Sequence, residues 1–196
     1  MINSVKPNLI VSDSRGAWFR ATILFILALI GTVGMWSVVV FIPDIEKEFG
    51  LDRGTSSLLY AFTMIGFGFG TVVIGKVYDK FGIKKPILLA TFVLITSYYF
   101  YSIFPFYWQF LILQFFMGFA ASAFFGPAMA DISNFFNKQR GFALSIVASA
   151  NYVAGATWPL LIGYFLTFID WRAAHFWISI CLFIMIPLIL LLKNAL

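Results

Sequence analysis

The chain has 196 residues, of which 62% are apolar and 11% are charged, whereas soluble domains are about half apolar and a quarter charged. This composition excludes an ordinary water-soluble globule and a disordered chain, because one soluble core of this length cannot bury so much apolar surface. A single cysteine and a single histidine exclude a disulfide framework, a cysteine-based zinc site and a multi-histidine metal site. The sequence therefore predicts an all-α polytopic membrane protein with neither metal nor cofactor.

Five long intervals lack Asp, Glu, Lys and Arg, and a membrane-spanning helix needs roughly 20 apolar residues. The interval 86–130 has 45 residues, about 68 Å as one helix and twice the ~30 Å hydrocarbon core. It must turn back once, near Pro105, Tyr107 and Trp108, because proline stops a helix and Tyr and Trp favour the lipid–water boundary. The sequence predicts one domain, 1–196, with six spans at about 18–42, 56–75, 86–104, 108–130, 142–168 and 173–192.

The basic residues predict how the spans are oriented. With Met1 in the cytoplasm, ten of the thirteen Lys and Arg residues lie in inner segments, and only Lys47, Arg53 and Arg172 lie outside. This arrangement satisfies the positive-inside rule and predicts that both termini are cytoplasmic, in the cell (inner) membrane. Contact with anionic lipid headgroups accounts for the basic balance, so we expect the lipid bilayer and not a nucleic acid as partner.

Small residues predict which spans pack closely, because helices in lipid associate where small side chains let their backbones approach. The first, second, fourth and fifth spans contain glycines, while the third and sixth contain none. We therefore expect the third and sixth spans to face lipid and the other four to face protein or a cavity. The predicted packing positions, which include two stripes of small residues four apart, are Gly66, Gly70, Gly118, Gly126, Gly155, Pro159 and Gly163.

The connection between the second and third spans carries a sequence motif. It reads GKVYDKFGIKKP from Gly75 and fits G-x-x-x-D-[RK]-x-G-x-[RK]-[RK] at Gly75, Asp79, Lys80, Gly82, Lys84 and Lys85. Gly75 would let the helix end approach another helix closely, and Gly82 can take a positive φ for a tight reversal. Asp79 at the membrane edge can accept hydrogen bonds from a helix N-terminus or pair with a cation.

This motif, at this place in the chain, resembles the cytoplasmic loop signature of the major facilitator superfamily. FFNKQRGFALSI (135–146) and WRAA (171–174) are similar to the monocarboxylate and oxalate–formate transporter branch. The resemblance implies the first six of twelve spans, with Asp79 latching this half onto a second half in the outward-open state. The first and fourth spans would line the solute path, and the second and fifth would meet the second half.

No charged side chain lies deep in any predicted span, and Gln114 stands where many members of the superfamily have an arginine. Polar residues near mid-span are therefore the candidates for lining a substrate cavity. Gln114 and Asn151 are favoured, because an unpaired amide in hydrocarbon is costly; alternatively, they bond to each other or to neighbouring helices. The full candidate set is Thr32, Trp36, Ser37, Tyr60, Gln114, Ser122, Asn151 and Tyr152.

Two further polar positions lie near span ends. Asp131 closes the fourth span, and we expect it to contact Lys138 or Arg140 in the following cytoplasmic loop. His175 is predicted to lie at the outer membrane boundary without a catalytic role. No Gly-x-Ser-x-Gly segment accompanies this histidine, so an intramembrane protease, and an enzyme generally, is not expected.

The leading hypothesis is secondary active transport of a small organic solute, most simply a carboxylate anion, by alternating access, with a proton or counter-anion as a possible co-substrate. Six helices alone leave the cavity wall open to lipid, so we expect a second six-helix half. It could be C-terminal sequence missing from a truncated carrier, which we favour, a separate chain or a second copy. The alternative is a transport-inactive membrane subunit, assembly factor or gene remnant.

Overall fold

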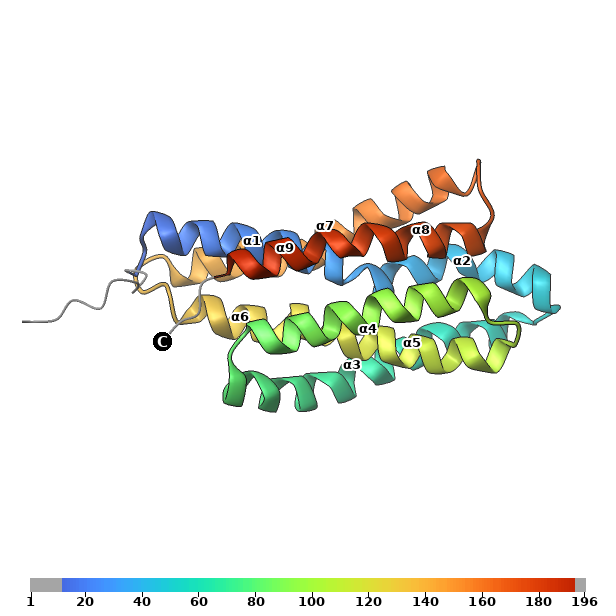
Figure 1. The fold of residues 1–196 in the computed structure, drawn as a ribbon, viewed down its shortest axis with the longest axis horizontal. Helices are drawn as coiled ribbons and strands as arrows, with labels where there is room; N and C mark the ends of the chain where they lie inside the picture. The colour runs from blue at the N-terminus through green and yellow to red at the C-terminus, as the bar shows by residue number, and fades with distance from the viewer. Residues whose placement is uncertain (1–11, 193–196) are drawn as a thin grey trace, which may run out of the picture.

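The structure is a computed structural model that describes residues 12–192, and within this range every regular element is helical. The basic residues Lys6 and Lys193, which enter the topology prediction, lie outside it. Helices form an elongated bundle of six membrane-spanning segments (Figure 1). The elements are α1 (Arg15–Gly31), α2 (Val33–Phe49), α3 (Arg53–Phe81), α4 (Lys84–Ile103), α5 (Tyr107–Ala121), η1 (Ser122–Phe124), α6 (Gly126–Ser133), α7 (Arg140–Phe165), α8 (Trp171–Cys181), η2 (Leu182–Ile184) and α9 (Met185–Leu191).

Three spans are each built from more than one helical element. The first joins α1 and α2 across Thr32, the fourth joins α5 and α6 through η1, and the sixth joins α8 and α9 through η2. The Thr32 hydroxyl donates to the Ala28 carbonyl at 2.8 Å, which satisfies a backbone group at the first junction. The fourth-span break separates Gly126 from the helix that carries Gly118, so the predicted small-residue stripe does not run straight through.

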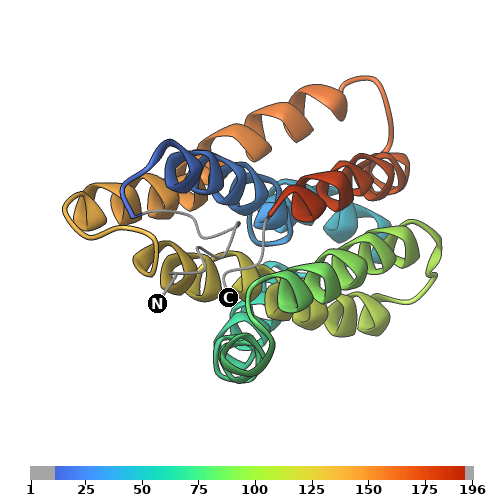
Figure 2. The same ribbon diagram turned by 60° about the vertical axis from the view of Figure 1, so that its left-hand side comes forward.

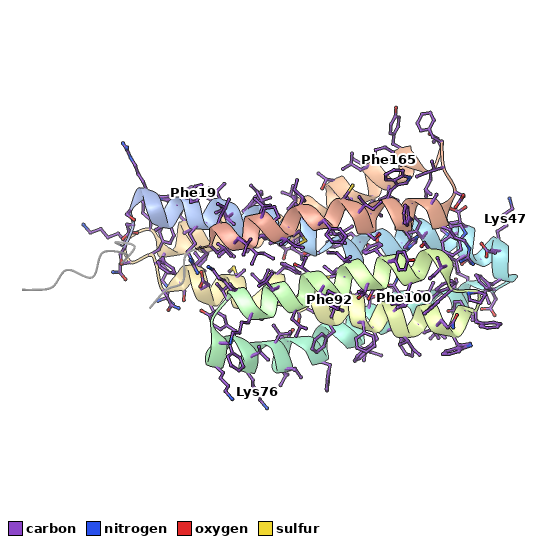
Figure 3. The ribbon with its side chains drawn as sticks, viewed as in Figure 1. Phe19, Lys47, Lys76, Phe92, Phe100 and Phe165 are labelled. Carbon is purple, nitrogen blue, oxygen red and sulfur yellow. The ribbon has the colours of Figure 1, made fainter. Side chains whose placement is uncertain are left out.

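The two ends of the bundle carry its turns and its charged side chains. We call the end with the 82–83 and 134–139 turns the motif end, and the end with the 50–52, 104–106 and 166–170 turns the opposite end (Figures 1 and 2). Lys76 and Lys47 mark these two ends, whereas aromatic residues such as Phe92 and Phe165 project from the sides (Figure 3). Phe92 is 65% exposed and is one of many large hydrophobic side chains exposed on the bundle, an arrangement that fits sides surrounded by hydrocarbon rather than water.

Helices α3 and α5 approach most closely through glycine. A Cβ added to Gly66 would lie 2.0 Å from the Phe115 carbonyl oxygen, and one added to Gly118 would lie 1.9 Å from the Thr63 carbonyl oxygen. Gly70 meets the Phe119 backbone in the same way. These three glycines therefore permit backbone-to-backbone packing that any side chain would prevent.

The other predicted packing positions behave differently. Gly155 makes room for the Trp36 indole, since an added Cβ would lie 3.0 Å from that ring. At Gly126 and Gly163 an added Cβ would meet nothing within 4 Å among the described residues, so their packing role stays a prediction. Pro159 lies inside α7, which continues through it.

The expectation that the third and sixth spans simply face lipid needs correction. Within one apolar 18-residue stretch of each span, buried residues make up 44% in α4 and 39% in α8–α9, but only 28% in α3 and 22% in α7. Helices α4 and α8 pack against each other and bury Tyr98, Tyr101 and His175 between them and their neighbours. Aromatic rings rather than glycines fill this contact. Within the described chain, α3 and α7 have the most exposed surface.

Candidate transport site

The motif loop reverses the chain between α3 and α4. Gly82 has φ +71°, the left-handed region predicted from the motif, which favours glycine because it lacks a Cβ. A Cβ at Gly75 would meet nothing within 4 Å among the described residues, so the expected close approach of Gly75 to another helix stays a prediction. Asp79 and Lys80 are exposed, and no hydrogen bond or ion pair to the Asp79 carboxylate occurs within residues 12–192.

A buried ion pair joins two spans beside this loop. The Arg20 Nε donates to Asp131 Oδ2 at 2.5 Å and Nη2 donates to Oδ1 at 2.8 Å, with both side chains at most 5% exposed. The Arg20 guanidinium also lies 4.5 Å from the centre of the Phe135 ring. The predicted contact of Asp131 with Lys138 or Arg140 is therefore wrong: α6 faces the start of α1, while Arg140 begins α7 as an exposed side chain.

Asp13 ties the segment before α1 to the start of α7. Its carboxylate accepts backbone hydrogen bonds from Asn137, Lys138 and Gln139 at 3.1–3.3 Å. Partial desolvation would raise the pKa of this carboxyl, but the three N–H donors outweigh it and hold the pKa below 3.8. At the motif end, the buried Arg20–Asp131 pair thus joins spans one and four, and the three hydrogen bonds to Asp13 join the segment before α1 to the start of α7.

Four of the predicted cavity residues lie inside the bundle with their polar groups satisfied. The Thr63 hydroxyl donates to the Gln114 side-chain oxygen at 2.8 Å, and the Gln114 amide donates to the Tyr101 hydroxyl at 3.3 Å. The hydroxyls of Ser37 and Tyr98 lie 2.6 Å apart. Gln114 therefore bonds to neighbouring helices and not to Asn151. Thr32 and Ser122 are also buried and donate to carbonyls of their own segments.

His175 lies one turn after the start of α8, near the opposite end of the bundle, but its side chain is buried inside the bundle. It is 1% exposed, and its ring stacks on Tyr101 with centroids 4.3 Å apart and an interplanar angle of 6°. Its Nδ1 lies 2.7 Å from the Trp171 carbonyl oxygen. Nothing in the local sequence distinguishes this arrangement from an interfacial histidine, because its partners come from α4, α2 and α8.

Trp36 and Asn151 form a polar contact near mid-span, and both side chains are partly exposed. The Trp36 indole N–H donates to the Asn151 side-chain oxygen at 3.1 Å, and Gly155 lies one turn further along α7 beneath the same indole. Among the described residues, the Asn151 amide nitrogen makes no hydrogen bond, which leaves its two N–H groups available. Asn151 stands eleven residues after the start of α7 and fourteen before its end, close to the middle of the span.

The last two candidates are exposed on the two most exposed spans. Tyr152 follows Asn151 and is 72% exposed, and Tyr60 on α3 is 37% exposed. The structure therefore divides the eight predicted residues into four internal ones, a half-buried Trp36–Asn151 pair and two exposed tyrosines. Only the second and third groups lie where a solute outside this bundle can reach them.

At the opposite end, helix ends are joined by hydrogen bonds and an ion pair that the sequence did not predict. Glu48 accepts hydrogen bonds from the Trp171 indole at 2.8 Å and from Arg172 at 2.6 Å, and Arg172 also donates to the Phe104 carbonyl at 2.8 Å. Asp52 caps α3 by accepting from the Thr55 N–H at 2.8 Å, and this bond lowers the pKa of the carboxyl below 3.8. The Glu48 and Arg172 contacts join α2, α4 and α8, whereas the Asp52 cap lies within α3.

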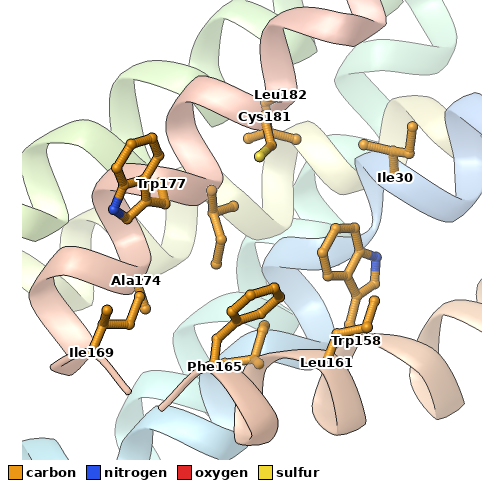
Figure 4. A pocket seen from close by; sticks show the side chains of 11 residues that line it. Ile30, Trp158, Leu161, Phe165, Ile169, Ala174, Trp177, Cys181 and Leu182 are labelled. Carbon is orange, nitrogen blue, oxygen red and sulfur yellow. The ribbon is translucent and has the colours of Figure 1, made fainter. Parts of the chain in front are cut away.

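An apolar cavity of about 430 Å³ lies between α1, α7 and α8 (Figure 4). Trp158 and Phe165 reach it from α7, Trp177 and Cys181 from α8, and Ile30 from α1. None of the eight predicted cavity residues lines it. Its walls lack the convergent polar groups that orient a polar solute. Because neither Trp36 nor Asn151 lines it, the cavity is separate from the Trp36–Asn151 contact.

Taken together, six apolar spans, charged ends and a half-buried polar contact at mid-span define a polytopic integral membrane protein of transporter type. The sequence model of the Major Facilitator Superfamily matches residues 24–195, and the chain belongs to this family. Family members generally move solutes across membranes rather than catalyse reactions.

Three relatives illustrate the match. The chain is 31% identical over 105 residues to the MFS transporter asaE of Aspergillus flavus, which covers 53% of this chain and 23% of that protein. It is 26% identical over 156 residues to the agnestins efflux protein AgnL12 of Paecilomyces divaricatus, covering 76% and 35%. It is 23% identical over 172 residues to the inner membrane transport protein YnfM of Escherichia coli, covering 86% and 41%. The chain therefore spans less than half the length of each of these relatives.

Proposed function

We propose that this chain forms one six-helix half of a secondary transporter that carries a small organic solute by alternating access. Family membership supports membrane transport, and the short share of each relative that the chain covers supports the need for a second half. We place the protein in the cell (inner) membrane with both termini cytoplasmic, which follows from the distribution of Lys and Arg.

The observation that carries the proposal is the Trp36–Asn151 contact. It is half-buried at mid-span, where transporters of this architecture bind substrate between two repeats, and it leaves amide N–H donors unused. Tyr152 adds a hydroxyl on the same helix. Neutral donors of this kind can bind a carboxylate, the solute class suggested by the likeness of 135–146 and 171–174 to the monocarboxylate and oxalate–formate branch.

The exposed surfaces of α3 and α7 are the proposed contacts with the second half. They are the least buried spans of the chain, and Asp79 and Lys80 project at the motif end of α3 with no partner for the Asp79 carboxylate within residues 12–192. We assign Asp79 the latch role of the family motif, in which it holds a helix N-terminus or cation of the second half.

Uptake into proteoliposomes tests the proposal. The protein as expressed, with and without a second half, is assayed with lactate, formate and oxalate under an imposed pH gradient and, separately, with counter-anion inside. Asn151→Leu is compared with Thr157→Val, a matched control on α7 whose hydroxyl donates to the carbonyl of Val153. A hydrogen bond to a charged group contributes about 1.5–3 kcal/mol, so Asn151→Leu should lower carboxylate uptake about tenfold or more.

Two results would contradict the proposal. Uptake that is equal in Asn151→Leu and in the unsubstituted protein would remove the Trp36–Asn151 contact from the solute path. Lack of uptake under every condition, with the second half supplied, would favour the transport-inactive membrane subunit instead. A smaller loss for neutral solutes than for carboxylates would support the solute class.

A further inference from the structure

The cavity between α7 and α8 arises because these consecutive helices pack against different partners. Helix α7 packs on α1 and α2, whereas α8 packs on α4, and few direct contacts join α7 to α8. The two helices therefore diverge, as Figure 4 shows, and side chains from α1, α7 and α8 surround the space left between them. The solute path proposed above plays no part in this geometry.

The walls of the cavity are almost entirely apolar, and the Trp177 indole, for which no hydrogen bond occurs among the described residues, lies at the exposed rim. All eleven lining residues are aliphatic, aromatic or cysteine. The Trp158 indole N–H is already donated to the Leu29 carbonyl at 2.8 Å, which also holds this ring in place as a wall. A polar group placed deep in the cavity, away from this rim, would lose its own hydrogen-bond partners without replacement. The occupant that fits these walls is hydrocarbon.

The cavity is continuous with the surface that faces the bilayer. Its rim includes Leu161, Phe165 and Trp177, which are 49%, 53% and 55% exposed. Along the sixth span, the lining runs from Ala174 to Leu182, about 12 Å at 1.5 Å per residue and close to the ~15 Å depth of one leaflet. The cavity therefore extends from near the opposite end to the middle of the membrane.

The chemistry and depth of the cavity indicate its occupant. The lining is apolar over the depth of one leaflet, and the rim opens to the side of the bundle, which are the surroundings that a hydrocarbon chain requires. We propose that this cavity is a binding site for one acyl chain of a phospholipid, taken from the leaflet next to the opposite end.

Photo-crosslinking tests this site on the protein as expressed. The protein is placed in vesicles of phosphatidylethanolamine and phosphatidylglycerol that contain a small fraction of phosphatidylcholine with a mid-chain diazirine. After illumination, adducts are mapped by peptide mass spectrometry. We expect adducts on Leu161, Phe165 and Cys181 to exceed those on Phe92, which is at least as exposed on α4. Similar labelling at Phe92 and at the cavity would overturn the proposal, whatever the variants show.

Two variants fill the cavity and a third serves as control. Cys181→Phe and Leu161→Trp should each reduce adducts at the remaining cavity residues to the Phe92 level. Ala156→Phe, at an exposed α7 position outside the cavity, should leave them unchanged. Helix content by circular dichroism checks that each variant is folded. Unchanged labelling in folded filling variants would overturn the proposal, as would crosslinks of cavity residues to another protein chain that block lipid adducts.

Discussion

Replacing Gly66 with alanine tests the close approach of α3 and α5. The new Cβ would lie 2.0 Å from the Phe115 carbonyl oxygen, and ordinary contact begins at 3.4 Å. Helix α5 would therefore have to move by more than 1 Å, because a backbone carbonyl cannot rotate away as a side chain can. Overpacking of this kind costs about 1–3 kcal/mol, and we expect the upper end of that range.

Gly68→Ala is the matched control. Gly68 lies on the same helix two residues later, and a Cβ there would meet nothing within 4 Å. Both substitutions gain about 1 kcal/mol of helix propensity, so their difference isolates the packing cost. We expect Gly68→Ala to keep or raise the free energy of unfolding, and Gly66→Ala to lower it by about 2 kcal/mol, a gap of about 3 kcal/mol.

The assay is unfolding by dodecyl sulfate in mixed micelles, followed by circular dichroism and tryptophan fluorescence. Equal changes in the free energy of unfolding for the two variants would refute the reasoning, since they differ only in what the new methyl group meets. A Gly66→Ala variant more stable than the unsubstituted protein would show that α3 and α5 are not in backbone contact.

Three further perturbations have expected outcomes. Asp131→Asn should cost about 3–5 kcal/mol of unfolding free energy because it leaves the Arg20 charge buried. Replacing both residues by apolar side chains should recover most of this stability, and an equal loss in the single and double variants would contradict the expectation. The Asp13 carboxyl has a lowered pKa in the folded state, so its contribution to stability is full above pH 3.8 and is lost as the pH falls through the pKa of the folded state. Hydrogen exchange at the start of α7 should therefore rise at low pH, and Asp13→Asn should abolish this pH dependence. Glu48→Gln removes the charge that Trp171 and its neighbouring arginine contact, and exchange of α8 amides should rise while that of α6 amides does not.

Most spans could be predicted from the sequence because ions in hydrocarbon are costly enough for charge-free intervals to locate them, and Pro105 divides the one interval that is too long for a single span. The positive φ of Gly82 was predictable for a similar reason, since the motif places a glycine within a short reversal. Both features depend on residues close together in the chain, so no knowledge of which helices are neighbours is needed.

Contacts between spans were harder to predict. Asp131 pairs with Arg20, 111 residues away, and sequence spacing favours the nearer Arg140 because it carries no record of which helix ends meet. Gly126 falls four residues after a buried serine, yet the break at η1 removes it from the stripe. His175 is buried because two other helices, α2 and α4, supply aromatic rings around it, which no local pattern encodes.

The accessibility of Tyr152 to water tests the proposed solute path most directly. In a Cys181→Ala background, Tyr152→Cys and Phe92→Cys are compared in native membranes with a small charged thiol reagent. The two positions are similarly exposed on the described chain, 72% and 65%, so only what surrounds them in the membrane differs. We predict that the cysteine at 152 reacts and the one at 92 does not. An unreactive cysteine at 152, or equal reaction at both, would contradict the account.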